Sequence, residues 1–310
     1  MEPIQESMKK WMRDHKQFQQ RLQNMKEEVV KSSEIQTLLK EHKSISMEAI
    51  DKHLIKLYEY QTQSKDCEKC PSRDECINIL PGYVPRVEVQ NDEIKLAYDK
   101  CKRQRKKEHQ DHQRSLVSSL HMPKEIMEAT LERLDLKDPD RGKAVEKTVH
   151  YIESLGDELP AKGLYFHGPF GVGKTYFLGA IANELSKKNI ASMIIYMPEF
   201  VREMKNSIKD DSMNGKIEAF KKTPILMLDD MGAESQSAWF RDEVLGSILQ
   251  YRMMERLPVF FTSNYSLEEL EKVLMTSNRG DIDQVKAKRI TERIRQLSEL
   301  VPVKGRNRRG

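Results

Sequence analysis

A glycine-rich stretch in the middle of the chain has the residue types and spacing that bind phosphate. Residues 167–177 read HGPFGVGKTYF, so a glycine, four further residues and Gly-Lys-Thr follow in order. Its glycines let the backbone wrap tightly, with successive N–H groups pointing inward. We expect Lys174 to bridge the outer phosphates of a nucleotide and the Thr175 hydroxyl to bind Mg²⁺. The predicted phosphate loop comprises Gly168, Pro169, Phe170, Gly171, Val172, Gly173, Lys174 and Thr175.

The flanking sequence favours this prediction over an ordinary glycine-rich turn. The run KGLYF before the loop suits a short buried strand, and TYFLGAIANELSKK after it has apolar residues at helical spacing. A strand, the loop and a helix in this order are the context that a phosphate loop requires. The positive N-terminal end of the helix adds to the attraction for phosphate.

Two carboxylates follow the apolar run PILML further along the chain. Asp229 and Asp230 stand at the end of what we predict to be a buried strand. We expect Asp229 to organise Mg²⁺, and Asp230 to act as the general base or to orient the water that attacks the γ-phosphate. The alternative is a plain Asp-Asp turn after a strand, and the phosphate loop upstream argues against it.

The next apolar run, PVFFTSN, places Asn264 at its polar tip. An amide there can hold the attacking water or sense the γ-phosphate, and the hydroxyls of Thr262 or Ser263 can share that role. Asn264 also suits the N-terminal cap of a helix that starts near SLEEL. Its place after the two preceding motifs favours the catalytic role.

Two arginines near the end of the chain can serve a neighbouring subunit. Residues 286–309 hold nine basic and two acidic residues, and Arg289 and Arg293 are four apart, on one helix face. An arginine presented to a neighbour's γ-phosphate acts as an arginine finger, whose charge stabilises the transition state. The alternative is ordinary surface basicity, which suits Lys286, Lys288 and Arg295.

All four cysteines lie in one short region, and their spacing suggests a metal site. They are Cys67, Cys70, Cys76 and Cys101. A Cys-x-x-Cys turn followed by two more thiols suits a tetrahedral Zn²⁺ site, whereas disulfides are not expected in a reducing cytosol. We expect residues between Cys76 and Cys101 to fold back as a small hairpin. Because the spacing to Cys76 is irregular, free thiols remain an alternative, and His109 or His112 can replace one ligand.

Composition excludes a uniformly basic nucleic-acid-binding protein. One third of the residues are charged, but the net charge is only +4, so any contact with nucleic acid must come from local patches. The run 102–114 holds six basic and two acidic residues and suits either such a patch or a solvated helix face. No apolar run approaches the roughly 20 residues of a membrane span, and MEPIQESMKK lacks a signal-peptide core. We expect a cytoplasmic protein without membrane contact.

The order of apolar runs predicts two domains. Phe18, Leu22, Met25 and Val29 recur at helical spacing, as do Met47, Ile50, Leu54 and Leu57, which predicts a helical and zinc-binding domain over residues 1–101. A charged linker, flexible or helical, follows over 102–119. From residue 120 to 310 the runs GLYFH, SMIIYM, PILMLDD and PVFFTSN alternate with helical segments, as in an α/β domain with a parallel sheet covered on both faces. Phosphates are expected at the carboxyl edge of that sheet.

Taken in order, GPFGVGKT, ILMLDD, FFTSN and AKRITERI resemble the AAA+ ATPases. Among these, the chain is similar to the DnaI/DnaC family of bacterial replicative-helicase loaders, because a four-cysteine module precedes the ATPase domain and because of IIYMPEFVREMK and LDDMGAES. The resemblance covers residues 120–310 by motif, and the N-terminal part by architecture and cysteine placement.

The resemblance implies roles for both domains in DNA replication, within a primosome. The N-terminal domain would bind the ring-shaped hexameric helicase, and the AAA+ domain would bind ATP with Mg²⁺, assemble with copies of itself and contact single-stranded DNA. By position, the phosphate loop is Walker A, Asp229 and Asp230 are Walker B, Asn264 is sensor 1 and Arg293 is the arginine finger. Arg309, or Arg308 beside it, would be sensor 2.

Two departures from the AAA+ pattern indicate a slow ATPase that works as a switch. Asp230 stands where a glutamate is usual, and no helical lid follows the last motif. For DNA, the helix around Phe200, Arg202 and Lys205 offers an aromatic ring and cations. Its alternative is a helix that covers the sheet with Phe200 in the core.

Three other functions fit parts of the pattern. A transposition-regulating AAA+ ATPase would bind duplex DNA and a transposase. A phosphate-loop kinase would need an acceptor pocket and a lid. An adaptor with a vestigial pocket would show no ATP turnover.

Overall fold

The computed structural model shows a chain that forms two compact units, Met1–Gln110 and Asp111–Gly310. The described residues are 4–42, 45–67, 70–90, 93–134, 138–207, 213–234, 237–276 and 283–308. Among the described helices, none combines the length and the apolar composition that crossing a bilayer requires.

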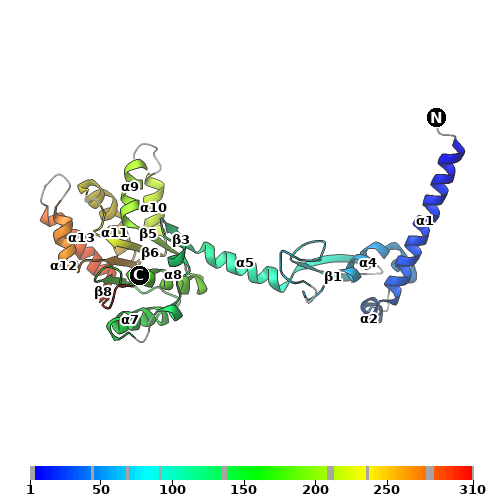
Figure 1. The fold of residues 1–310 in the computed structure, drawn as a ribbon, viewed down its shortest axis with the longest axis horizontal. Helices are drawn as coiled ribbons and strands as arrows, with labels where there is room; N and C mark the ends of the chain where they lie inside the picture. Colours follow the sequence, from blue (N-terminus) through cyan, green and yellow to red (C-terminus); the bar gives the residue numbers. More distant parts are fainter. Residues whose placement is uncertain are drawn as a thin grey trace. The chain divides into compact units, whose positions relative to one another are not determined.

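The first unit is a helical core joined by an antiparallel hairpin (Figure 1). Its elements are α1 (Ile4–Lys31), α2 (Ser33–Glu41), α3 (Met47–Lys52), α4 (Leu54–Thr62), β1 (Tyr83–Gln90) and β2 (Glu93–Lys100). Val29, Ile35 and Leu57 are fully buried among the helices, and Ile94 brings β2 into the same core. The helical N-terminal region is confirmed, and the hairpin forms between Cys76 and Cys101 as the sequence predicts.

The charged run after this hairpin is helical. It forms α5 (Lys102–Ser115), which buries none of its side chains and contains the position where the two units divide. Strand β3 (Val117–Leu120) follows almost at once and pairs in parallel with β5 (Ser192–Tyr196). Residues 117–119, placed in the linker by the sequence patterns, therefore belong to the sheet of the second unit.

The second unit is built on a six-stranded parallel sheet. In spatial order the strands are β3, β5, β6 (Ile225–Met231), β7 (Val259–Ser263), β4 (Gly163–His167) and β8 (Ser298–Pro302). Every neighbouring pair is parallel. The four apolar runs of the sequence are β4, β5, β6 and β7, so the predicted α/β class with a parallel sheet is confirmed. The short strands β3 and β8 add the two edges.

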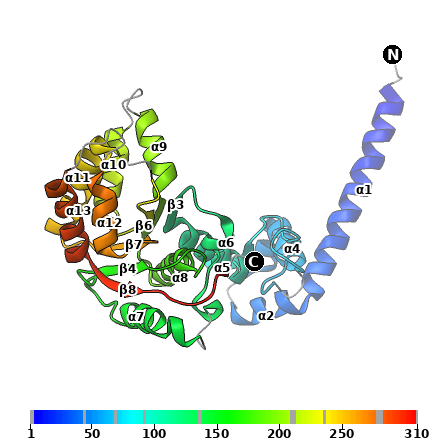
Figure 2. The same ribbon diagram turned by 60° about the vertical axis from the view of Figure 1, so that its left-hand side comes forward.

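Helices cover both faces of this sheet (Figure 2). The helices on one face are α6 (Lys124–Met127), η1 (Leu131–Arg133), η2 (Pro139–Arg141), α7 (Gly142–Glu153) and α8 (Lys174–Lys187). The helices on the other face are α9 (Met197–Ser207), α10 (Met213–Lys222), the π-helix η3 (Phe240–Leu245), α11 (Gly246–Met254), α12 (Leu267–Met275) and α13 (Gln284–Leu297). A hydrophobic core lies on each face of the sheet, and alternate strand residues point into one or the other. Phe166 lies in the core on the α8 face, and Tyr165 lies in the core on the α13 face. This is the layered arrangement that near-continuous apolar strands require.

A buried arginine holds the starts of two central strands. Arg252 of α11 has no exposed surface. Its guanidinium donates hydrogen bonds to the backbone carbonyls of Phe220, Lys221, Thr223, Pro224 and Pro258. Burial lowers the pKa of Arg252 to about 9. Because these carbonyls stand at the end of α10 and before β6 and β7, the cation fixes the strands whose far ends carry Asp229 and Asn264.

The structure decides between the two expectations for the helix around Phe200. Phe200 is 1% exposed and packs edge-on against Phe220 and Phe240. Its ring therefore belongs to the core and cannot stack on a DNA base, so the prediction of an aromatic DNA contact here is wrong. Of the two cations on this helix, Arg202 is exposed and pairs with Glu199 at 3.0 Å.

Candidate nucleotide-binding site

The phosphate loop joins the end of β4 to the start of α8. Gly168, Gly171 and Gly173 all have positive φ angles, of 150°, 76° and 88°. A Cβ on Gly168 would lie 2.1 Å from the carbonyl oxygen of Val303, and one on Gly171 would lie 2.0 Å from Asn307 Oδ1. The loop thus needs glycine both for its backbone conformation and for the close approach of residues 303–308.

Lys174 connects the loop to the end of β7. The side chain is buried, and its Nζ donates to the carbonyl oxygens of Gly168 and Pro169 and to Asn264 Oδ1, each at 2.8 Å. The ammonium group therefore lies between the loop and the strand end where the γ-phosphate is expected.

Asp229 lies beside the predicted magnesium hydroxyl. It is 3% exposed and accepts hydrogen bonds from Thr175 Oγ1 at 2.9 Å and from Thr262 Oγ1 at 2.6 Å. Burial raises the pKa of Asp229 to about 6, against the opposing effect of the two hydroxyl donors. A hydroxyl and a carboxylate at this distance are the hard oxygen donors that Mg²⁺ prefers, so these residues fit the ion.

Asp230 and Asn264 face each other across the ends of β6 and β7. Asp230 has a φ of 61°, and its N–H donates to Thr262 Oγ1 at 2.8 Å. Asn264 Nδ2 donates to Asp230 Oδ1 at 2.9 Å, while Asn264 Oδ1 accepts from Lys174 Nζ. The amide therefore lies between the proposed base and the loop cation.

The alternatives for the polar tip of β7 are resolved by two contacts. Ser263 is fully buried and donates to the carbonyl of Met231 at 2.6 Å, so its hydroxyl takes no part in the site. Ser266, with Glu269, caps α12 in a reciprocal capping box. Asn264 is therefore not the helix cap, and Thr262 and Asn264 are the polar groups of β7 that belong to the site.

The motif residues line one open pocket with a volume of about 660 Å³. The motif residues in its lining are Gly171, Gly173, Lys174, Thr175, Asp229, Asp230 and Asn264. Other parts of its lining are His121, Met122, Pro123, Ile126, Arg133 and Tyr176. A pocket of this size that is lined by both charged and apolar side chains suits a nucleotide.

The part of the pocket lining that precedes η2 was not predicted as part of the site. Residues 121–134 contain only short helical turns, and no motif or periodic pattern distinguishes them in the sequence. Asn183 of α8 donates to the carbonyls of Met127 and Ala129 at 2.9 and 2.7 Å, which docks the segment on the helix after the loop. Gly179 permits this contact, because a Cβ there would lie 2.1 Å from the Ile126 carbonyl.

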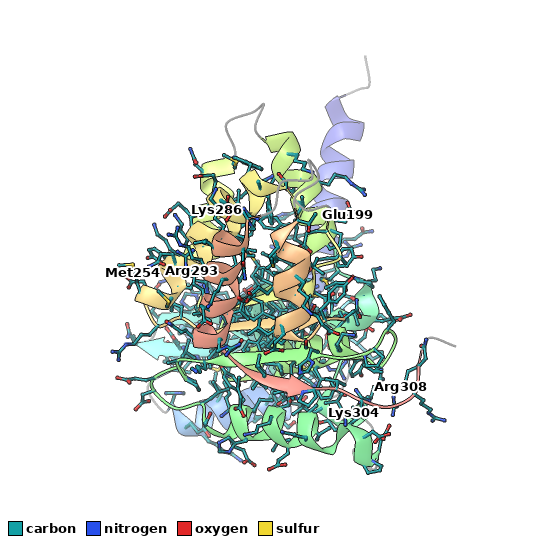
Figure 3. All side chains as sticks on the ribbon, turned by 90° about the vertical axis from the view of Figure 1, so that its left-hand side faces the viewer. Glu199, Met254, Lys286, Arg293, Lys304 and Arg308 are labelled. Carbon is teal, nitrogen blue, oxygen red and sulfur yellow. The ribbon has the colours of Figure 1, made fainter. Side chains whose placement is uncertain are left out.

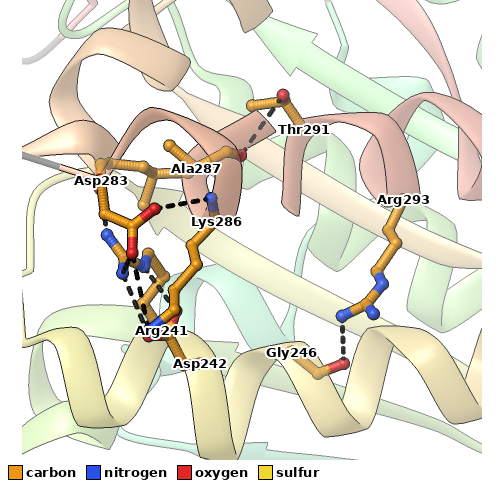
Figure 4. Close-up of polar contacts among 9 residues, drawn as sticks. Arg241, Asp242, Gly246, Asp283, Lys286, Ala287, Thr291 and Arg293 are labelled. Atoms are coloured by element: carbon orange, nitrogen blue, oxygen red, sulfur yellow. Dashed lines mark hydrogen bonds and ion pairs between the residues drawn. The ribbon is translucent and has the colours of Figure 1, made fainter. Parts of the chain in front are cut away.

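The two predicted finger arginines lie on α13, and neither lines this pocket. Arg293 is half-buried and donates to the Gly246 carbonyl of α11 at 2.8 Å (Figure 4). Burial, with the charge of Arg289 as a second cause, lowers the pKa of Arg293. Arg289, one turn earlier, is exposed. Neither arginine therefore contributes to the lining of the pocket in its own chain.

A cluster of charges fixes the first turn of α13. Lys286 pairs with Asp242 at 3.0 Å and with Asp283 at 3.6 Å, and the buried Arg241 pairs with Asp242 at 2.7 Å (Figure 4). Arg241 also donates to the Leu274 carbonyl, at the end of α12. Lys286 thus has a structural partner, whereas none of the ion pairs among the described residues includes Arg289.

The C-terminal residues lie against the phosphate loop rather than forming a helix in their described part. The N–H of Arg308 donates to the Gly171 carbonyl at 2.9 Å, and its guanidinium pairs with Asp138 at 2.7 Å. Arg308 lines the pocket, and Figure 3 shows it far from Arg293 across the unit. Arg309, the other predicted sensor 2 residue, lies outside the described residues.

The four cysteines gather in the first unit. Cys67, Cys70 and Cys101 are buried in one cluster with Cys76 packed against it, and the sulfurs of Cys70 and Cys76 are 3.9 Å apart. Burial acts to raise the pKa of Cys76, but N–H groups of the Gly82 and Asn78 backbone outweigh it and lower that pKa. Within the described residues, no group of three or more Cys, His, Asp or Glu side chains has the arrangement of a metal centre. His109 and His112 are exposed on α5 and are not among the side chains packed in this cluster.

Comparison with known proteins gives the family. Residues 1–98 match the family model described as primosomal protein DnaI N-terminus, and residues 86–310 match the IstB-like ATP binding protein model. The replicative helicase loader DnaI of Bacillus subtilis is 44% identical over 310 residues, which are 100% of this chain and 99% of that protein. The chain belongs to the DnaI family of replicative helicase loaders.

More distant and structural relatives agree with membership of the DnaI family. The replicative helicase loader DnaC of Escherichia coli is 23% identical over 133 residues, 42% of this chain and 53% of that protein. A crystal structure of DnaI superimposes with a TM-score of 0.56 at 49% identity, covering 64% of this chain and 100% of that one. A primosome component from Streptococcus pyogenes gives 0.53 at 35% identity, over 64% of this chain and 99% of that one.

Proposed function

We propose that the protein is an ATP-dependent loader that binds the replicative DNA helicase through its first unit and delivers it onto single-stranded DNA. The observation that carries the proposal is the similarity to a replicative helicase loader along the full chain, including the N-terminal unit. The second unit supplies an ATP site with its loop, carboxylates and sensor residue in contact with one another.

The alternative of a transposition-regulating ATPase has one point in its favour. The model that matches residues 86–310 is described as IstB-like. That match excludes most of the N-terminal unit, which instead matches a primosomal family. Membership of the family does not favour the kinase or the vestigial-adaptor alternative, and the contacts among Lys174, Asp230 and Asn264 support an active ATPase site.

The ATP site is best explained as a switch shared between subunits. Lys174 and the loop backbone bind the phosphates, Asp230 and Asn264 position the attacking water, and Arg293 of an adjacent copy completes the site. Bound Mg²⁺ supplies charge neutralisation at the β- and γ-phosphates. A site completed by a neighbour makes head-to-tail assembly depend on the nucleotide, so ATP and ADP favour different arrangements of the subunits. The short carboxylate of Asp230 supports slow hydrolysis.

We also propose that the protein contacts single-stranded DNA, but not through the ring of Phe200. The exposed side chains of Arg202 and Lys205 on α9 can neutralise phosphates, and the buried Phe200 cannot stack on bases. We therefore expect DNA binding that depends strongly on salt concentration and little on base identity.

We further propose that the cysteine cluster holds a structural Zn²⁺ ion. Three of the thiols share one buried cluster with the fourth packed against it, and the N–H donors that lower the Cys76 pKa favour a thiolate there.

In the purified protein we expect about one zinc ion per chain by elemental analysis. A chelator selective for Zn²⁺, used with Mg²⁺ in excess, should weaken helicase binding while ADP affinity stays unchanged, because the nucleotide site lies wholly in the second unit. Cys70→Ser should lose the metal and Ser72→Ala should keep it. A metal-free first unit that resists heating equally well would refute the zinc site.

The loader function is tested with the full chain, a hexameric replicative helicase and circular single-stranded DNA, onto which a closed ring cannot thread. The expected result is a stable complex with the helicase, and transfer of the helicase to the circle only when the chain and ATP are both present. Failure to bind any replicative helicase, together with selective binding of a transposase on duplex DNA, would establish the alternative instead.

A further inference from the structure

A further cation lies beside the phosphate loop, on a segment that no motif identifies. Arg141 is the last residue of η2 and directly precedes α7. It is 3% exposed and lines the same pocket as the loop. A Cβ on Gly173 would lie 3.3 Å from Arg141 Nη2, so the guanidinium lies against the turn that leads into α8.

The environment of Arg141 holds its guanidinium in one orientation. The guanidinium carbon lies 4.8 Å from the centre of the Phe177 ring, on the inner face of α8. Because all five N–H donors lie in the guanidinium plane, stacking on the ring does not consume them. The Nη2 edge is directed at Gly173, where the helix N-terminus presents its N–H groups.

The C-terminal residues close over the same segment. Asp138 of the turn before η2 pairs with Arg308, and a Cβ on Gly305 would lie 3.3 Å from Asp138 Oδ2 and 3.9 Å from the side chain of Arg141. Arg141 is therefore held from two sides, by α8 and by the C-terminal residues. Such support is typical of a group that must be positioned before its ligand arrives.

We propose that Arg141 binds the α- and β-phosphates of the nucleotide in its own chain. A planar guanidinium fork matches phosphate oxygens in two-point contacts, and the glycine-rich turn that Arg141 touches is the part of a phosphate loop that cradles these two phosphates. Lys174, which reaches Asn264, serves the γ-phosphate side instead. The proposal rests on the ATP site described above and adds one binding residue to it.

It follows that different cations bind different phosphates of the nucleotide. Arg141 contacts phosphates that ATP and ADP share, so it strengthens the binding of both nucleotides equally. It does not help the protein to distinguish them. Discrimination is left to Lys174 and to the arginine of the neighbouring subunit, whose contacts involve the γ-phosphate.

The test is to measure Kd for ADP and for a non-hydrolysable ATP analogue in the full chain carrying Arg141→Gln. Because hydrogen bonds to charged groups contribute about 1.5–3 kcal/mol, we expect both Kd values to rise by the same factor of about 10 to 100. Lys143→Gln is the control, because it removes an exposed positive charge two residues away on α7. Its Kd values should match the wild type.

A second substitution protects the test against misfolding. If Arg141→Gln melts below the assay temperature, Arg141→Lys keeps the charge but loses the fork, and we expect about a 10-fold weaker affinity for both nucleotides. Unchanged ADP affinity in a folded variant would overturn the proposal, and so would a loss confined to the ATP analogue. Either outcome leaves the ATP site itself intact, provided that Lys174→Ala still abolishes nucleotide binding.

Discussion

Replacing Arg293 with alanine is expected to reduce assembly-dependent ATP hydrolysis by about 10³-fold or more, the contribution typical of an arginine finger. Arg293 lies on α13, outside the pocket of its own chain, and its guanidinium rests on the Gly246 carbonyl. Removing it should leave ATP affinity of the single chain unchanged. The measurement is the ATPase rate as a function of protein concentration, with and without helicase, alongside Kd for ATP.

The control for Arg293 is Arg295→Ala on the same helix. Arg295 is exposed and lies 3.6 Å from Glu268, so its loss should change the rate less than two-fold. Because Arg293 also contacts α11, the melting temperature of the Arg293→Ala protein must be compared with the wild type. A folded variant that hydrolyses ATP at the wild-type rate at high protein concentration would exclude Arg293 as the finger and leave the exposed Arg289 as the candidate.

Asp229→Asn is expected to reduce hydrolysis by about 10²-fold or more, because a correctly held metal contributes several kcal/mol to the transition state. Asparagine has the same shape, and its amide oxygen can still accept from Thr175 and Thr262, so the fold should survive. The charge that organises Mg²⁺ is lost. We expect the remaining rate to need far more Mg²⁺, which a magnesium titration of the ATPase rate measures.

The Asp229→Asn protein is compared with a second Asp229 variant and with a control variant at another carboxylate. Asp229→Ala should lose hydrolysis at least as completely, but it also leaves both hydroxyls without their buried partner and should melt at a lower temperature. Asp157→Asn, at an exposed carboxylate of the second unit outside the pocket, is the matched carboxylate control and should retain magnesium-dependent turnover. Full activity of the Asp229→Asn protein at ordinary Mg²⁺ concentration would remove Asp229 from the metal site.

The central strands of the sheet were predictable because each of them has a recognisable pattern in its own sequence. Strands β4 to β7 are buried on both faces, and therefore appear in the sequence as apolar runs with a polar tip. The edge strands β3 and β8 were not predicted. Residues VSSL and SELVP are short and half polar, as edges with one solvated side can be. Their place in the sheet comes from pairing with neighbours that are distant in the sequence.

The site residues likewise include some that the sequence predicts and some that it does not. Lys174, Asp229, Asp230 and Asn264 were predictable because each belongs to a motif at a strand end, and the structure brings them into contact. Arg141 and the segment 121–134 were not, because their contribution depends on docking against α8. One local trace of that docking is Gly179, a glycine inside a helix, which usually lowers helix stability unless another element packs there.

Phe200 shows the opposite failure, in which a pattern suggested more than the fold permits. An aromatic residue followed by two cations suits a nucleic-acid surface, but it suits an amphipathic helix on a sheet equally well. The packing of Phe200 on Phe220 and Phe240 decides for the core. No local feature of the sequence separates the two cases, because they differ only in which face of α9 meets the sheet.

The shared ATP site is tested most directly by mixing two inactive proteins. Under the proposal, Lys174→Ala keeps the arginine finger but does not bind the phosphates, and Arg293→Ala keeps the phosphate site but lacks the finger. In an equal mixture, about a quarter of the subunit interfaces would pair an intact phosphate site with an intact finger. We therefore predict that the mixture, with helicase present, recovers roughly a quarter of wild-type hydrolysis. A mixture as inactive as either protein alone, although the two assemble together, would show that no neighbouring chain completes the site.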